Sequence, residues 1–214
     1  MELTVTMGVA PLAAEGRSMQ LQTDTGYTVT LDRAYLSLGA VEIHGCNETG
    51  GDALLRRWFG PKLALAHTTS SPTRIGEPFV LSLLARDREP VEIGMLRPPP
   101  GDYCVTQVDL EAADDDARGL PDDVDVVGAT LDVAGSWSNA DESGQDFQLR
   151  TATGSERSLE QPFSLSRNER QRTLALRALV DHAFDGVEFT EQTETEQAKT
   201  VLSNIAQGLE ARMQ

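Results

Sequence analysis

The chain has 214 residues, a formal net charge of −16 and a hydrophobic content of 39%. This length suits one large all-β domain, or at most two small ones, and is enough to bury a core without a metal. The acidic balance opposes binding to nucleic acid and to anionic lipid, which both attract basic proteins. The charge fits either solubility in a salty medium or attraction of cations.

The first candidate strand follows Met1 directly. In "LTVTMGV" the apolar residues alternate with polar ones, as they do on one face of a strand, at Leu3, Val5, Met7 and Val9. No signal peptide is visible before this strand, and we therefore expect a mature domain. A cytosolic acidic protein is the alternative.

The stretch "GYTVTLDRAYLSLGAVEIHG" at 26–45 is too long for one regular strand. Its apolar residues change parity twice, near Asp32–Arg33 and again at Gly39. One extra residue in a strand shifts the side-chain alternation by one position, and we therefore predict a β-bulge at each of these places.

Residues 58–79, "WFGPKLALAHTTSSPTRIGEPF", are too apolar for a solvated loop and too rich in Pro and Gly for one regular element. We predict a long loop folded over a sandwich, with its prolines preventing regular pairing. Its covering residues would be Trp58, Phe59, Leu63, Leu65 and Phe79. The flanking stretches 52–60 and 77–87 are candidate helical turns.

Six further candidate strands lie between 89 and 182, separated by turn signals such as "RPPPGD" and "ADESGQD". In the first, Val91, Ile93 and Met95 share one face, and in the last, His182 ends the strand on its apolar face. The acidic run at 110–126 is typical of a solvated loop. A weak calcium site is its alternative interpretation, with the candidate ligands Asp114, Asp115, Asp116, Asp122 and Asp123.

The tail carries the one clear helix pattern, at about 194–212. Thr193 and Glu196 have the spacing of a capping box, and Val201, Ile205 and Leu209 recur at helical spacing. The predicted fold class is therefore all-β: a single, mostly antiparallel β-sandwich domain over 1–214 with a long covering loop and a C-terminal α-helix.

The two cysteines, Cys46 and Cys104, each lie at the end of a predicted strand. We expect one disulfide between them, which would indicate an oxidising compartment. Two buried free thiols are the main alternative, and a reactive pair is a third.

Most catalytic motifs are absent from the sequence, including nucleophile elbows, phosphate loops and zinc-protease motifs. The remaining candidates for a functional site are the three histidines, His44, His67 and His182. Imidazole suits copper or zinc, and a thioether would favour Cu(I); the candidates for it are Met7, Met19 and Met95. Each histidine has an alternative role as a hydrogen-bonded structural residue.

Several segments together resemble the MbnP-like family of bacterial extracytoplasmic copper-binding proteins. They are the opening strand with "YTVTLDRAYLSLGAVEI", the segments "AHTTSSPTRIGEPF" and "LRPPPGDYCVTQV", and the tail "FDGVEFTEQ" with "VLSNIAQGL". The resemblance implies a secreted, periplasmic or lipid-anchored β-sandwich that holds copper through His. It also implies a tryptophan that a di-haem partner enzyme can oxidise to kynurenine. His67 with Trp58 is the position to which these properties would carry over.

We therefore expect a non-catalytic, extracytoplasmic protein that binds a transition metal, copper first, through His67 with His44 or His182 as a second donor. A structural or protein-binding β-sandwich module without a metal site is the alternative.

Overall fold

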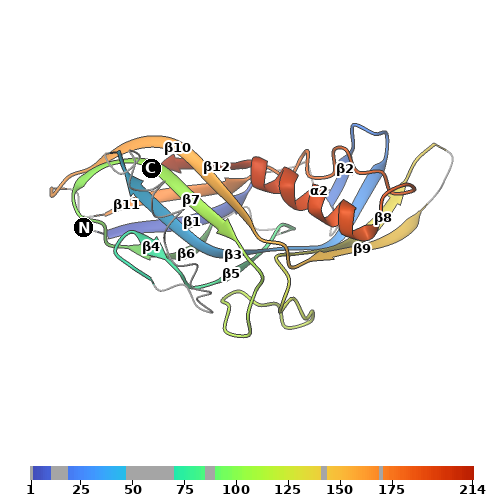
Figure 1. The fold of residues 1–214 in the computed structure, drawn as a ribbon, viewed down its shortest axis with the longest axis horizontal. Coiled ribbons are helices and arrows are strands. Elements are labelled where there is room, and N and C mark those ends of the chain that lie inside the picture. Colours follow the sequence, from blue (N-terminus) through green and yellow to red (C-terminus); the bar gives the residue numbers. More distant parts are fainter. Residues whose placement is uncertain (1, 11–18, 47–69, 85–89, 141–143, 169–170) are drawn as a thin grey trace, which may run out of the picture.

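The computed structural model describes residues 2–10, 19–46, 70–84, 90–140, 144–168 and 171–214. Within these residues, two β-sheets face each other and one helix packs beside them (Figure 1). The smaller sheet has the strand order β12–β11–β1–β6, with β1 Glu2–Val9, β6 Val91–Leu96, β11 Gln171–Ala178 and β12 Leu209–Met213. The all-β sandwich that the sequence predicts is confirmed.

The larger sheet has the strand order β10–β7–β3–β8–β9, and three short strands pair with its central strand β3. Its main strands are β3 Thr28–Gly45, β7 Gly101–Leu110, β8 Leu131–Ser138, β9 Gln145–Thr151 and β10 Ser155–Leu165. The short strands are β2 Met19–Gln22, β4 Arg74–Ile75 and β5 Phe79–Ser82.

Strand β3 is 18 residues long and runs across most of the molecule (Figure 1). Its pairing with β8 shifts register between Leu31 and Arg33, and its pairing with β7 shifts between Leu38 and Ala40. These are the two bulges that the parity changes predict. A bulge bends a strand, and β3 can therefore pair with β8 along its first half and with β7 along its second.

The smaller sheet joins the two ends of the chain. Strand β1 pairs in parallel with β11 and antiparallel with β6, while β12 pairs antiparallel with β11. In β1 the side chains of Leu3, Val5 and Met7 are fully buried, as their alternation predicts. They belong to one hydrophobic cluster that takes residues from both sheets and from the helix.

Helix α2, Glu194–Gln207, is amphipathic and begins at the predicted capping box. The Thr193 hydroxyl accepts from the Glu196 backbone N–H, and the Glu196 carboxylate accepts from the Thr193 N–H. Val201, Leu202 and Ile205 bury their side chains against the sandwich. In the part of the chain that the structure describes, no helix is both long and apolar enough to cross a bilayer.

The predicted end of this helix, at about 212, is wrong. The helix stops at Gly208, and Leu209–Met213 turn back as strand β12. A Cβ on Gly208 would lie 2.5 Å from the carbonyl oxygen of Leu179, and this close backbone approach requires glycine. Leu209 is buried as predicted, but it belongs to strand β12 and not to the helix.

Three other local predictions are corrected. Phe79–Ser82 form strand β5 beside β3, where helical turns and a covering loop were expected. In β6 the pairing with β1 skips Ile93, so that Ile93 is buried while Val91 and Met95 are 41% and 43% exposed. Strand β11 ends at Ala178, and His182 lies in the turns that follow it. Residues 58–69 of the predicted covering loop, with the helical turns at 52–60, lie outside the described residues.

The acidic segment 111–130 packs on the outer face of the larger sheet. Ala113, Ala117 and Val126 form a small second cluster with Val80. Beneath it, the buried carboxylate of Asp132 accepts hydrogen bonds from Arg33 at 2.8 Å and from Arg150 at 3.1 Å. Arg150 also donates to two backbone carbonyls of the segment. The segment is thus attached to the sheet as well as solvated.

Candidate metal-binding residues

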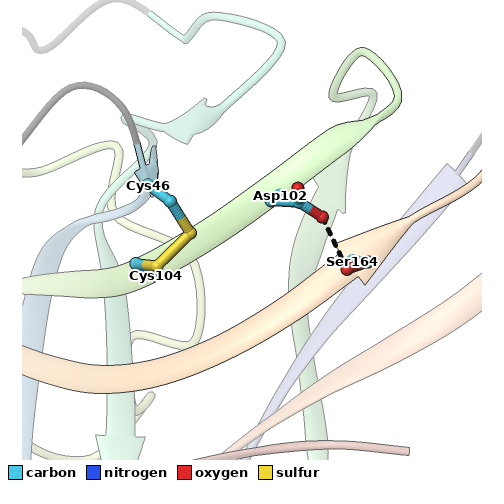
Figure 2. Close-up of a disulfide and its surroundings, with 4 residues drawn as sticks. All are labelled: Cys46, Asp102, Cys104 and Ser164. Atoms are coloured by element: carbon cyan, nitrogen blue, oxygen red, sulfur yellow. Dashed lines mark hydrogen bonds between the residues drawn. A yellow bond between two sulfur atoms is a disulfide. The ribbon is translucent and has the colours of Figure 1, made fainter.

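The disulfide predicted from the strand ends is confirmed. The Sγ atoms of Cys46 and Cys104 are 2.05 Å apart and join the end of β3 to the start of β7 (Figure 2). In the same part of β7, Asp102 accepts a hydrogen bond from the hydroxyl of Ser164 on β10 at 2.6 Å (Figure 2). Side-chain links therefore connect three neighbouring strands at this end of the sheet.

His44 lies two residues before Cys46, opposite Val105 of β7. The preceding residue, Ile43, is buried in the core, and the alternation of a strand therefore places His44 on the outer face of the sheet. Its side chain is half-buried. The Nε2 atom is closed off from solvent and has no hydrogen-bond partner among the residues that the structure describes.

A charged cluster lies on the same outer face, next to His44. The Arg74 guanidinium on β4 donates to Glu42 at 2.6 Å and to Asp109 at 2.9 Å. Burial alone would lower the pKa of Arg74, but the hydrogen bonds and charges of Glu42 and Asp109 raise it above the ordinary value. Arg74 therefore engages one oxygen of each carboxylate beside His44.

His182 is in a different environment, with its side chain 84% exposed. Its Nδ1 lies 2.7 Å from the Asp185 carboxylate. Asp185 also accepts from the backbone N–H of Asp24, just before the start of β3. Imidazole and carboxylate are thus a surface pair in which one ring nitrogen is engaged.

His44 and His182 lie at opposite ends of β3. Asp185 places His182 near Thr28, the first residue of the strand, and His44 is sixteen residues further along. A strand rises about 3.3 Å per residue, so this separation is on the order of 50 Å. One metal ion therefore cannot bind both histidines. His67 and Trp58 lie outside the described residues, and a site that includes them stays a prediction.

The other candidate ligands are separated as well. Met7 and Met19 are buried in the hydrophobic core, while Met95 projects from β6 with 43% of its side chain exposed. Across the described residues, no group of three or more His, Cys, Asp or Glu side chains has a geometry that could hold a metal ion. The calcium site considered for the acidic run stays without structural support.

Sequence reasoning did not single out Arg157 and Gln161 on β10. Arg157 Nε and Gln161 Oε1 are both buried atoms, and no described residue forms a hydrogen bond with either. Their positions follow the alternation of the strand, on the side that carries the buried Leu159 and Phe163. A polar residue at an inward position of an alternating strand is the signal that could have found them.

In comparisons with known proteins, no family model, no curated protein and no solved structure matches this chain. The MbnP-like resemblance therefore stays a prediction, based on the segments quoted above.

Proposed function

We propose that this protein binds a transition metal, copper first, in an extracytoplasmic compartment and without catalysis. His44 is the donor that the folded β-sandwich supplies. The observation that carries the proposal is its buried Nε2 atom, for which the described part of the chain provides no hydrogen-bond partner. A buried polar atom without a partner costs about 1–3 kcal/mol, and a ligand that engages it recovers this cost.

Imidazole nitrogen is a ligand for copper and zinc. His44 sits where the backbone is fixed on three sides: by pairing with β7, by the disulfide two residues later, and by the Ile43 N–H, which donates to the Thr73 carbonyl at 2.9 Å. A donor held in this way loses little conformational freedom when it binds a metal.

His67 is the proposed second donor, and chain connectivity favours its pairing with His44. Ser70, the first described residue after it, accepts a hydrogen bond from the Gly76 N–H beside β4. Strand β4 pairs with Val41 and Glu42, immediately before His44. His182, at the other end of β3, is not part of this version of the site.

The proposed compartment rests on the disulfide, because such bonds persist in secreted and periplasmic proteins and are rare in the cytosol. A periplasmic or extracellular location, with or without a lipid anchor, belongs to the same proposal. The di-haem partner enzyme, which would oxidise Trp58, enters through the family resemblance. Intact mass of the exported protein would reveal such an oxidation.

The test is metal analysis of untagged protein exported to an oxidising compartment, followed by competition with a chromophoric Cu(I) chelator. We expect one copper per chain. His44→Ala and His67→Ala should each weaken copper binding at least about tenfold, because each removes a ligand. His182→Ala is the matched control and should leave the affinity unchanged.

Unchanged copper stoichiometry and affinity in both His44→Ala and His67→Ala would refute the site. Absence of bound metal would favour the second candidate, a structural or protein-binding β-sandwich module. The observation in favour of this candidate is the lack of a three-ligand group among the described residues.

A further inference from the structure

Strand β9, Gln145–Thr151, is an edge strand of the larger sheet. Among the described strands it pairs only with β8, along its whole length and without a register shift. Its side chains alternate: Phe147 and Leu149 face the core, while Asp146, Gln148 and Arg150 are exposed. An edge strand presents a row of backbone N–H and C=O groups with which another strand can pair.

The other described sheet edges carry features that oppose such pairing. Strand β10 contains Pro162 and a bulge, and it lies against β12. Strand β6 is bulged too, and Arg118 donates to its Glu92 carbonyl at 3.0 Å. The strands β2, β4 and β5 have four residues or fewer. By contrast, β9 has no proline, no lysine, no bulge and no charge that faces the core, and these are the usual means of protecting an edge.

The pairing on the other side of β8 shows which backbone groups of β9 are free. The Ser37 N–H of β3 donates to the Thr130 carbonyl at 2.8 Å. The N–H of Leu131 belongs to the same trans peptide group and therefore points the opposite way, towards its partner Thr151 in β9. Since alternate residues of a strand direct their backbone groups to opposite edges, the odd-numbered residues of β9 bond to β8. The backbone groups that point to the free edge are those of Asp146, Gln148 and Arg150.

The sequence of β9 is complementary to itself in the antiparallel direction. With Gln148 opposite Gln148 of a second copy, Asp146 lies opposite Arg150 and Phe147 lies opposite Leu149, each twice. Opposite charges and aromatic–aliphatic pairs are favourable cross-strand neighbours. In this register the residues with free backbone groups face each other directly, and each such pair exchanges two hydrogen bonds. A shift by two residues would lose both ion pairs and shorten the overlap.

Arg150 can form this ion pair and keep its contacts within the chain. Its Nη1 donates to Asp132 and to the Asp125 carbonyl, and its Nη2 donates to the Val127 carbonyl. A guanidinium has five N–H donors, so two remain for Asp146 of the second copy. The strand carries one acid and one base, and its pairing therefore brings no like charges together although the chain as a whole carries −16.

We propose that β9 is a dimerisation edge, through which two copies of this chain pair antiparallel about a two-fold axis at Gln148. The larger sheets of the two copies then form one continuous sheet. An interface of this kind is isologous, because the same strand serves on both sides. It uses neither His44 nor His67, and it stands or falls independently of copper binding.

Sedimentation equilibrium over a range of protein concentrations tests the proposal, at about 0.15 M salt to screen the repulsion between two acidic chains. We expect a monomer–dimer equilibrium in the micromolar range, because one pair of strands buries a small area. Asp146→Lys should weaken dimerisation at least about tenfold, because it places a cation opposite Arg150 at two symmetric positions. Asp116→Lys makes the same change of charge next to Arg118, which pairs with β5 on the other side of β3, and should leave the equilibrium unchanged.

Gln148→Pro removes the central N–H of the free edge. Because this N–H does not bond to β8, the variant should keep its fold, which circular dichroism checks, and lose the dimer. A monomer at every concentration of the wild-type protein would overturn the proposal. So would a dimer that persists unchanged in both Asp146→Lys and Gln148→Pro.

Gln148→Cys tests the register. Cys46 and Cys104 are joined, so the new cysteine carries the one reactive thiol among the described residues. Directly opposite residues of a hydrogen-bonded pair have Cα atoms about 5.5 Å apart, within the reach of a disulfide. Mild oxidation should therefore give a covalent dimer, whereas Asp116→Cys should stay monomeric. A non-covalent dimer in which Gln148→Cys does not cross-link would overturn the two-fold axis at Gln148.

Discussion

The two ends of the larger sheet are stabilised in different ways. The helix end, where α2 and five aromatic side chains pack beside the start of β3, is closed by apolar contacts. Its aromatic residues are Tyr27, Trp137, Phe147, Phe184 and Phe189. The disulfide end, where β3 finishes, is linked by the Cys46–Cys104 bond and by the ion pairs of Arg74.

The two ends also differ in the hydrogen bonding of their polar side chains. At the helix end, Gln197 Nε2 donates to three backbone carbonyls, and Asn204 Nδ2 donates to two. Towards the disulfide end, three buried atoms have no hydrogen-bond partner within the described ranges: His44 Nε2, Arg157 Nε and Gln161 Oε1. A satisfied polar network specifies a fold, whereas an unsatisfied one is costly unless a ligand completes it. The satisfied polar side chains thus lie at the helix end and the unsatisfied ones towards the disulfide end, which is where we propose that a ligand binds.

The largest effect is expected from Ile205→Asp in the helix. Ile205 is 1% exposed, and the substitution would place a charge within the apolar contact between α2 and the sandwich. We expect a loss of about 5 kcal/mol of unfolding free energy, measured by urea denaturation. Ser203→Asp, on the exposed face of the same helix, is the control and should change little. Equal stability of the two variants would show that the helix does not hold that end together.

Removal of the disulfide should have the next largest effect. Cys46 and Cys104 are 58 residues apart, and the chain-entropy model gives about 4 kcal/mol for a loop of this length. The double variant Cys46→Ser, Cys104→Ser avoids an unpaired thiol, and denaturation without reductant measures its stability. Native-state hydrogen exchange sharpens the comparison. The Ile43 amide should exchange faster in the variant, while the Leu179 amide, bonded to Gly208 at the helix end, should change only with global stability.

The smallest expected effect is a pH dependence at the start of α2. The backbone and side-chain hydrogen bonds from Thr193 lower the pKa of Glu196 below its ordinary value of 4.5. Because the folded-state pKa is the lower one, the capping box stabilises the helix above pH 4.5, and this contribution is lost as pH falls through the folded-state pKa.

Carboxyl ¹³C NMR of Glu196 against pH measures this shift directly. Glu196→Gln should remove the pH-dependent step in the Thr193 amide signal, and Glu194→Gln should preserve it. A Thr193 amide signal that ignores the titration of Glu196 would contradict the capping role.

Local patterns predicted much of this architecture. The parity changes of β3 located both bulges, and the strand-end positions of Cys46 and Cys104 indicated their pairing. The end of α2 was missed because Leu209 is buried in either conformation, and only the packing of Gly208 against Leu179 decides between them. The sequence pattern did not predict that Ile93 is buried while Val91 and Met95 are exposed. The bulge in β6 that causes this arises in its pairing with β1, which the local pattern of β6 does not contain.

The candidate sites were less accessible to sequence reasoning. His44 and His182 have equivalent local patterns at presumed strand ends, and only the topology places them at opposite ends of β3. Arg157 and Gln161 lie beside β12, which is some fifty residues away in the chain and belongs to the other sheet. Such proximity follows from tertiary packing, on which a single sequence carries little information.

The parallel pairing of β1 with β11 has a consequence for the order of folding. Strand β1, Glu2–Val9, pairs with β6 on one side. On its other side it pairs with β11, Gln171–Ala178, which is more than 160 residues further along the chain. Contacts between such distant segments must overcome a large loop-closure entropy, and folding is slow when they dominate. During synthesis, one edge of β1 therefore stays unpaired until Gln171–Ala178 have emerged. The larger sheet, built from residues 19–165, can assemble first and act as the template on which the smaller sheet closes.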